Sequence, residues 1–203
     1  MPGNAPRLLV ATRNKGKLKE LRDLLGGVPY TLVSLADAGI DHEVEETGTT
    51  FAENAALKAT AYARLSGLPT LADDSGLEVD ALDGEPGVYS SRYAGVGATD
   101  AQRIAYLQKR MREAGANGTP STARFRCVIA IVMPGEPLEL HEGTCEGTII
   151  GTPRGTNGFG YDPVFLFPDL GKTMAELDTG EKNRISHRAE AARKAANSLR
   201  KRA

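Results

Sequence analysis

The sequence predicts a mixed α/β fold, in which a β-sheet is flanked by helices, and three patterns point to it. A short apolar run, Arg7–Thr12, passes through a basic turn directly into a leucine-patterned helix. Two further helices are announced by capping boxes that begin at Thr50 and Thr99. A long β pattern over residues 123–150 is interrupted by a Pro-Gly-Glu-Pro turn, which is typical of a hairpin. Because strands and helices alternate around this antiparallel hairpin, we expect a mixed sheet.

The first half of the chain is expected to hold strands and helices in alternation. After the strand at 7–12, a helix buries a leucine face and stops at Gly26-Gly27. The capping box Thr50–Glu53 opens an alanine-rich helix that ends near Gly67 and Pro69. Two short strands, at 70–74 and 77–82, are expected on either side of Ser75-Gly76.

The second half begins with the helix capped by Thr99 and Gln102, which ends at Gly115. The hairpin follows, with strands at 123–133 and 138–150, and we expect it to carry a second lobe. A glycine-rich stretch, 151–160, leads into an apolar run at 161–167. The final helix is predicted from apolar residues spaced three and four apart, which are Ile185, Ala189, Ala192, Ala196 and Leu199.

Length and composition indicate one domain, 1–203, that needs no metal or disulfide to hold its core together. The 25 basic and 26 acidic residues give a net charge of −1, which argues against a general nucleic-acid binder. No run approaches the length of a membrane span, and the N-terminus has no apolar signal region. Two cysteines without metal-ligand spacing suit a reducing cytosol, so we expect a cytoplasmic protein.

The turn after the first strand is a candidate polyphosphate site. Such a turn aims backbone N–H groups and the positive end of a helix at its ligand, and three basic side chains add charge. The segment consists of Thr12, Arg13, Asn14, Lys15, Gly16 and Lys17. It does not match a Walker A loop. The alternative is a solvated basic helix start.

Two acidic segments are candidates for a divalent cation and a general base. Asp73 and Asp74 end an apolar run, and because adjacent strand residues point to opposite faces, only one of them should face a ligand. Glu43, Glu45 and Glu46 precede the second helix. Mg²⁺ is usually held by one or two carboxylates together with phosphate oxygens, so one residue from each segment would suffice. Each segment alone is equally compatible with an acidic surface turn.

Two more segments are suited to recognising a flat ligand. The glycine loop 158–162 carries two aromatic residues and an acid, and its rings could stack on a base or belong to the core. Ser186-His187-Arg188 opens the final helix with two adjacent donors suited to carbonyl or phosphate oxygens.

Taken together, five segments resemble the non-canonical purine nucleoside triphosphate pyrophosphatases, the inosine/xanthosine triphosphatase (Ham1-like) family. In order, they are ATRNKGKLKEL, EETGTTFAENAALKA, LADDSGLEVDALDGEPGVYSSRYAG, GTNGFGYDPVF and EKNRISHRAEA, and they span nearly the whole chain. The resemblance implies an elongated mixed α/β fold of two lobes with a central substrate cleft, and a homodimer. It also implies Mg²⁺-dependent hydrolysis of ITP, dITP and XTP to the nucleoside monophosphate and pyrophosphate, which would cleanse the nucleotide pool.

The family's residue roles carry over by position. Thr12–Lys17 would hold the triphosphate, and Asp74 would be the catalytic acid, a metal ligand and the proton acceptor for the attacking water. Ser75 would contact substrate beside it. The metal glutamate falls on the pair Glu45-Glu46, of which we favour Glu45. The base pocket would be formed by Phe159, Gly160, Tyr161, Asp162, Lys182, His187 and Arg188.

Two alternatives remain. A Maf-like nucleotide pyrophosphatase would prefer pyrimidine or modified nucleotides, although the SHR and FGYD segments favour a purine. A nucleotide sensor that has lost hydrolysis would keep the phosphate turn, but it would not need Asp74 and a glutamate partner. Among purines, donors facing the C6 carbonyl of inosine or xanthosine would be left unpaired against the amine of adenosine.

Overall fold

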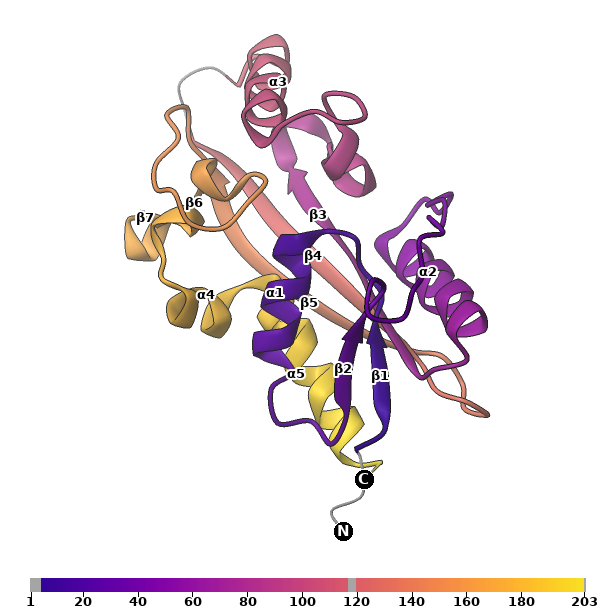
Figure 1. Cartoon of the computed structure of the whole chain (residues 1–203). Coiled ribbons are helices and arrows are strands. Elements are labelled where there is room, and N and C mark those ends of the chain that lie inside the picture. The colour runs from indigo at the N-terminus through magenta and orange to yellow at the C-terminus, as the bar shows by residue number, and fades with distance from the viewer. Residues whose placement is uncertain (1–4, 117–119, 203) are drawn as a thin grey trace. The chain divides into compact units, whose positions relative to one another are not determined.

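The structure, a computed structural model, describes residues 5–116 and 120–202. Across these residues, seven strands form one sheet in the order β2-β1-β3-β4-β5-β6-β7 (Figure 1). β1 runs parallel to β2 and β3, whereas β6 runs antiparallel to β5 and β7, so the predicted mixed α/β fold is confirmed. The strands are β1 (Arg7–Val10), β2 (Thr31–Ser34), β3 (Thr70–Val79), β4 (Ser121–Val132), β5 (Glu139–Ile149), β6 (Phe165–Phe167) and β7 (Lys172–Thr173).

The described chain divides into two compact units. The first contains the residues up to Asp74, Cys127–Gly143 and the residues from Arg188 onward, and the second contains Ser75–Arg126 and Thr144–His187. β3, β4 and β5 each continue from one unit into the other. The single-domain prediction for 1–203 and the expected central cleft stay predictions.

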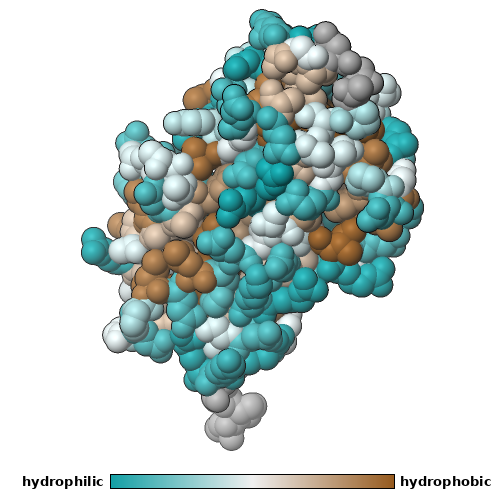
Figure 2. Space-filling view, turned by 180° about the vertical axis from the view of Figure 1, so that it is seen from behind, coloured by the Kyte–Doolittle hydropathy of each residue, from teal (hydrophilic) through white to brown (hydrophobic). Residues whose placement is uncertain are grey.

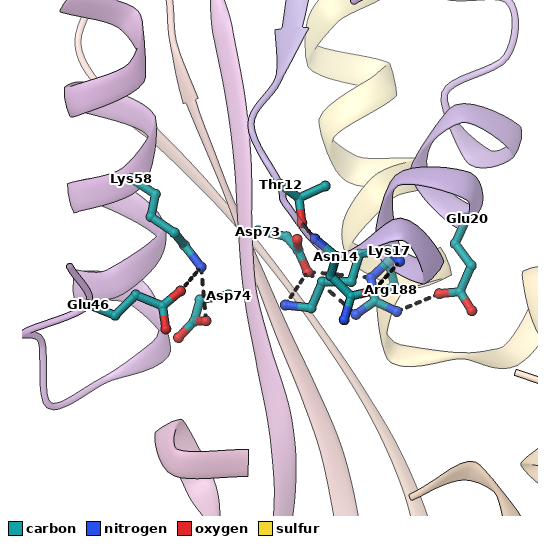
Figure 3. A network of polar contacts seen from close by, with 9 residues as sticks. All are labelled: Thr12, Asn14, Lys17, Glu20, Glu46, Lys58, Asp73, Asp74 and Arg188. Atoms are coloured by element: carbon teal, nitrogen blue, oxygen red, sulfur yellow. Dashed lines mark hydrogen bonds and ion pairs between the residues drawn. The ribbon is translucent and has the colours of Figure 1, made fainter. Parts of the chain in front are cut away.

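The core of the first unit lies between strands and two helices. α1 (Lys15–Leu24) contributes Leu21, and α5 (His187–Arg200) contributes a stripe of alanines that ends at Leu199. These residues pack on side chains of β1, β3 and β4 that include Leu8, Leu71 and Ile129. Small alanine side chains let α5 approach the sheet closely. α2 (Phe51–Ser66) lies on the other side of β3 from α1 and α5 (Figure 3).

The second unit has a core of its own, centred on aromatic and aliphatic side chains. α3 (Asp100–Glu113) buries Ile104, Leu107 and Met111 against residues of β3 and β4 such as Val79 and Phe125. α4 (Thr179–Ile185) completes the unit. The capping boxes predicted at Thr50 and Thr99 are both present, and the side chains of Glu53 and Gln102 accept from the backbone of Thr50 and Thr99, respectively.

Two expectations about elements are corrected. β3 is one continuous strand rather than two, and it runs through Gly76 to Leu77, whose amide donates to Ser90 Oγ at 2.9 Å. Ile185, which the apolar spacing assigned to the final helix, ends α4 instead, because Ser186 is extended (ψ 156°) and α5 starts at His187. In the apolar run at 161–167, a 3₁₀ turn that includes Pro163 precedes the strand Phe165–Phe167.

The surface shows no extended apolar area on the face seen in Figure 2, which is mostly hydrophilic with separate hydrophobic patches. Val96 and Tyr89 are the most exposed of the large apolar side chains, at 96% and 57%. None of the helices in the described part of the chain is both long and apolar enough to cross a membrane.

Candidate active site

The predicted phosphate turn connects β1 to α1 in the first unit. Asn14 is the N-cap of α1, and its side chain accepts a hydrogen bond from Lys17 N at 3.0 Å. The backbone N–H groups of Lys15 and Gly16 precede the first intrahelical bond, so they point out of the helix end. No acidic residue lies in the first turn, and Lys15 is exposed. The turn therefore presents donors and positive charge suited to an anion.

The parallel register places this turn beside the aspartates. Val10 of β1 is paired with Leu71 of β3, so Thr12 and Asp73, each two residues further along, come next to each other. Asp73 and Asp74 point to opposite sides of β3, as the strand alternation predicts (Figure 3). The two carboxylates consequently have entirely different partners.

Asp73 lies in a buried cluster of charges on the α1 side. Its Oδ2 is 3.1 Å from Lys17 Nζ and 3.4 Å from Arg188 Nε, and the side chain has no exposed surface. Arg188 also binds Glu20 of α1 at 2.5 Å. Burial alone would raise the pKa of Asp73, but the positive charges of Lys17 and Arg188 outweigh it and hold that pKa well below its ordinary value. Asp73 is therefore a permanently charged anchor for two cations.

Asp74 lies on the α2 side with Lys58 and Glu46. Lys58 Nζ is 3.1 Å from Asp74 Oδ1 and 2.5 Å from Glu46 Oε1, so the cation bridges the two carboxylates (Figure 3). Burial raises the pKa of Asp74 and the nearby charge of Glu46 adds to this, while Lys58 and Lys17 offset only part of it. A raised pKa brings a carboxylate closer to the range in which it can accept a proton in catalysis.

The donor set around Asp74 fits a divalent cation. Asp74 Oδ2 is buried and has no hydrogen-bond partner among the described residues. Those residues contain no cluster of three or more His, Cys, Asp or Glu side chains able to hold a metal. Two carboxylates are nevertheless enough for Mg²⁺ when phosphate oxygens complete its shell. Of the two candidate glutamates, Glu46 shares the Lys58 ammonium group with Asp74, whereas the Glu45 side chain is exposed.

The glycine loop belongs to the second unit, where a buried ion pair organises it. Asp162 Oδ2 accepts from Phe159 N at 3.0 Å and from Lys182 Nζ at 2.6 Å. Lys182 Nζ also lies 5.1 Å from the centre of the Phe159 ring, a cation–π contact. Gly158 has φ +75°, and a Cβ there would lie 1.9 Å from Asp162 Oδ2, so only glycine fits. Gly160 N donates to Asp100 Oδ2 at 2.7 Å.

The remaining base-pocket candidates have different surroundings. Tyr161 is buried in the core of the second unit and donates to Ser90 O at 2.9 Å, so its ring packs inside that unit. His187 stacks on Phe125, with ring centroids 4.7 Å apart, and its Nδ1 is 3.7 Å from Cys145 Sγ. Burial raises the pKa of the Cys145 thiol to about 12, so the thiol is neutral.

The structure thus groups the predicted residues by unit. The first unit brings Thr12–Lys17, Asp74 and Arg188 into the neighbourhood of β3, while Ser75, Phe159–Asp162, Lys182 and His187 belong to the second unit. Arg188, expected in the base pocket, binds Asp73 and Glu20, and its place in that pocket stays a prediction.

Sequence reasoning missed Lys58. Its signal was available, because Lys58 falls among Ala55, Ala59 and Tyr62 on the buried face of α2, where an unpaired lysine would be costly. Such a lysine indicates a carboxylate partner from elsewhere in the chain. Glu20 was missed as well, because its position on α1 does not reveal that its partner is the distant Arg188.

Comparison with known proteins gives a consistent result. A model described as the Ham1 family matches residues 8–198. A Bacillus licheniformis protein named dITP/XTP pyrophosphatase is 51% identical over 92% of this chain and 94% of its own length. A Geobacter sulfurreducens protein of the same name is 52% identical over 91% of this chain and 92% of its own. The solved structure of a HAM1 protein from Coxiella burnetii superposes with a TM-score of 0.87 at 42% identity, and covers 97% of this chain and 99% of that one.

Proposed function

This chain belongs to the Ham1 family, and we propose that the carboxylates and cations around Asp74 perform the hydrolysis for which its relatives are named. The chain is a nucleoside triphosphate pyrophosphatase that acts on non-canonical purine nucleotides such as dITP and XTP. The products are a nucleoside monophosphate and pyrophosphate. The observation that supports this role most directly is the buried, unpartnered Asp74 Oδ2, next to Lys58 and Glu46 and on the strand that adjoins the phosphate turn.

In this proposal the phosphate turn binds the triphosphate. The outward-pointing N–H groups at the start of α1 donate to phosphate oxygens, and Lys15 and Lys17 add positive charge. Asp73 binds the Lys17 ammonium group and is itself bound by Arg188, so the Lys17 side chain is already ordered when the nucleotide binds. Attack at the α-phosphate requires neutralised charge and an oriented water more than covalent chemistry.

Asp74 accepts the proton of the attacking water. Its Oδ2 is buried and has no hydrogen-bond partner among the described residues, so this oxygen is available to take up a proton. Lys58 bridges Asp74 and Glu46, and we propose that its ammonium group also neutralises charge that develops on the phosphate.

We propose Mg²⁺ as the cofactor, held by Asp74 and Glu46 rather than by Glu45. Glu46 is preferred because it shares Lys58 with Asp74. When bound, the ion would lower the pKa of a coordinated water and screen the phosphate charges.

The base is assigned to residues of the second unit. Phe159 offers a ring to stack on a purine, and Lys182 and His187 offer donors suited to a carbonyl at C6. Asp162 holds Lys182 and fixes the loop amide of Phe159. Arg188, which also binds Asp73, is kept in this pocket as the sequence predicts. A homodimer and a cytoplasmic location complete the proposal, the latter supported by the free, buried cysteines Cys127 and Cys145.

The direct experiment measures which phosphate product is released. With ITP, dITP or XTP and Mg²⁺, we expect pyrophosphate and the nucleoside monophosphate, with ATP and GTP nearly untouched, and no turnover in EDTA. Orthophosphate as the product would contradict attack at the α-phosphate. Turnover confined to pyrimidine nucleotides would instead favour the Maf-like alternative, and binding without turnover would favour a sensor.

His187→Ala is expected to reduce the preference for ITP over ATP, because a donor facing the C6 carbonyl would be lost. The ratio of kcat/KM for the two substrates is the quantity to measure. His141→Ala is the matched control, since His141 pairs with Glu139 in the first unit and has no place in the proposed site. An unchanged ratio in His187→Ala would remove His187 from base recognition.

A further inference from the structure

The segment that carries Glu46, residues 42–49, contains no helix or strand, yet it is bound to α2 at several points. Tyr62 OH donates to His42 O at 3.1 Å and accepts from Val44 N at 3.3 Å. Asn54 Oδ1 accepts from Gly48 N at 2.8 Å. Glu53 Oε2 accepts from Thr49 N at 2.7 Å, in addition to the bond from Thr50 N that belongs to the capping box. Backbone groups of this segment that have no partner in a helix or a strand are therefore hydrogen-bonded by side chains of α2.

The contact at Gly48 is too close for any side chain. A Cβ at Gly48 would lie 2.7 Å from both Asn54 Oδ1 and Glu53 Cβ, although the backbone there is not left-handed. Glycine is thus required for close approach to α2 and not for a special dihedral angle. Asn54 and Tyr62 are almost fully buried, at 0% and 3% exposure, so their hydrogen bonds to the segment are shielded from competing water.

The hydrogen bonds from α2 side chains reach the segment on both sides of Glu46. Val44 and Gly48 are each two residues from Glu46, one before and one after it, and both of their amides are bound by α2. Asn54, Lys58 and Tyr62 follow one another by one helical turn, so they share one face of α2. The central residue of that row, Lys58, binds the Glu46 carboxylate itself.

We propose that Asn54 and Tyr62 are positioning residues that fix the segment 42–49 on α2 and so hold the Glu46 carboxylate at Asp74. This inference rests on the proposed function, in which Glu46 and Asp74 hold the divalent cation. Neither residue touches substrate or metal; each acts through the backbone on one side of Glu46. Removing a hydrogen-bond partner of a metal ligand typically changes metal affinity by about 10–100-fold, and we expect Asn54 and Tyr62, which bind the backbone on either side of Glu46, to act in the same direction.

The test uses Tyr62→Phe in the full chain, which removes the hydroxyl and keeps the buried ring. We expect faster amide hydrogen exchange at Val44, with the Gly48 amide less affected because Asn54 still binds it. The Mg²⁺ concentration for half-maximal dITP hydrolysis should rise by about tenfold or more, and kcat should recover at saturating Mg²⁺. Mn²⁺ affinity, measured by electron paramagnetic resonance with a non-hydrolysable α,β-methylene analogue of dITP, should fall to the same extent.

Tyr93→Phe is the matched control. It removes a tyrosine hydrogen bond of similar length, from Tyr93 OH to Glu85 Oε2 at 2.7 Å, in the second unit. It should change neither the exchange of residues 42–49 nor the metal dependence. If Tyr62→Phe does not fold, Gly48→Ala provides the same test by steric displacement of the segment, and Asn54→Ala by loss of the Gly48 tie.

Glu46→Gln separates this inference from the proposed function. If Glu46→Gln raises the Mg²⁺ requirement but Tyr62→Phe and Asn54→Ala do not, the positioning role is wrong and the metal assignment stands. If Glu46→Gln leaves the Mg²⁺ requirement unchanged, the metal assignment itself is wrong. Faster Val44 exchange together with unchanged Mn²⁺ affinity would also overturn the positioning role, because the tie would then serve only the fold.

Discussion

Asp74→Asn is expected to lower kcat by about 10²–10⁴-fold, the range over which positioned general bases contribute. Asparagine keeps the shape of the side chain but cannot accept the proton of the attacking water. Lys58 would remain paired with Glu46, so the local structure should survive. Binding of the α,β-methylene analogue of dITP, measured by calorimetry, should fall much less than kcat, and thermal unfolding should be nearly unchanged.

The pH dependence of the wild-type enzyme provides a second check of Asp74. At a fixed saturating Mg²⁺ concentration, the acidic limb of kcat/KM should report the deprotonation of Asp74. Activity should increase as pH rises through that limb, because the deprotonated carboxylate is the active form. Near-native turnover in Asp74→Asn, or the same limb in that variant, would show that another group is the base.

Asp73→Asn is expected to lower the free energy of unfolding at pH 7 by about 3–5 kcal/mol, the usual cost of breaking a buried ion pair from one side. The substitution leaves the buried Arg188 guanidinium and the Lys17 ammonium without the carboxylate that they share. Glu20 still binds Arg188, so it compensates for part of the loss. Urea unfolding of both proteins measures the difference.

The stability difference between wild type and Asp73→Asn is expected to depend on pH. The folded-state pKa of Asp73 lies below its unfolded value, so its contribution to stability is fully present above about pH 4 and is lost as pH falls. The stability difference between wild type and Asp73→Asn should therefore shrink as the pH is lowered below about 4. A difference that is constant from neutral to acidic pH would mean that the carboxylate is not the charged anchor described above.

Asp80→Asn is the matched control for both aspartate variants. Asp80 pairs with Arg124 at 2.8 Å, but the Asp80 side chain is 44% exposed and solvent screens the pair. Its loss should cost less than about 1 kcal/mol and leave kcat unchanged. A cost as large as that of Asp73→Asn would show that burial is not what distinguishes the two ion pairs.

Local patterns were sufficient for the longer elements. The capping boxes at Thr50 and Thr99, and the leucine face of α1, are features of a few neighbouring residues, and all three helices occur as predicted. The short strands β2 and β7 were missed, whereas β1, which is no longer than β2, was predicted from its continuous apolar run. The opening of the last helix at Ser186-His187 was predicted, but the short helix α4 before it was missed, since the apolar spacing continues back to Ile185.

The amino-acid sequence was sufficient to predict the family and the mixed α/β class, and strand alternation predicted that Asp73 and Asp74 face opposite sides of a strand. The phosphate-binding role of the turn after β1 stays a prediction. Only the tertiary structure decided which partners those aspartates meet. It placed Lys58 and Glu46 by Asp74, and it took Arg188 to Asp73, a residue far away in sequence. The difference lies in the sequence separation of the interacting residues, because capping, periodicity and strand alternation involve only residues that are close together in the chain. The partner of a buried charge, in contrast, depends on which distant segments the packing of helices on the sheet brings together.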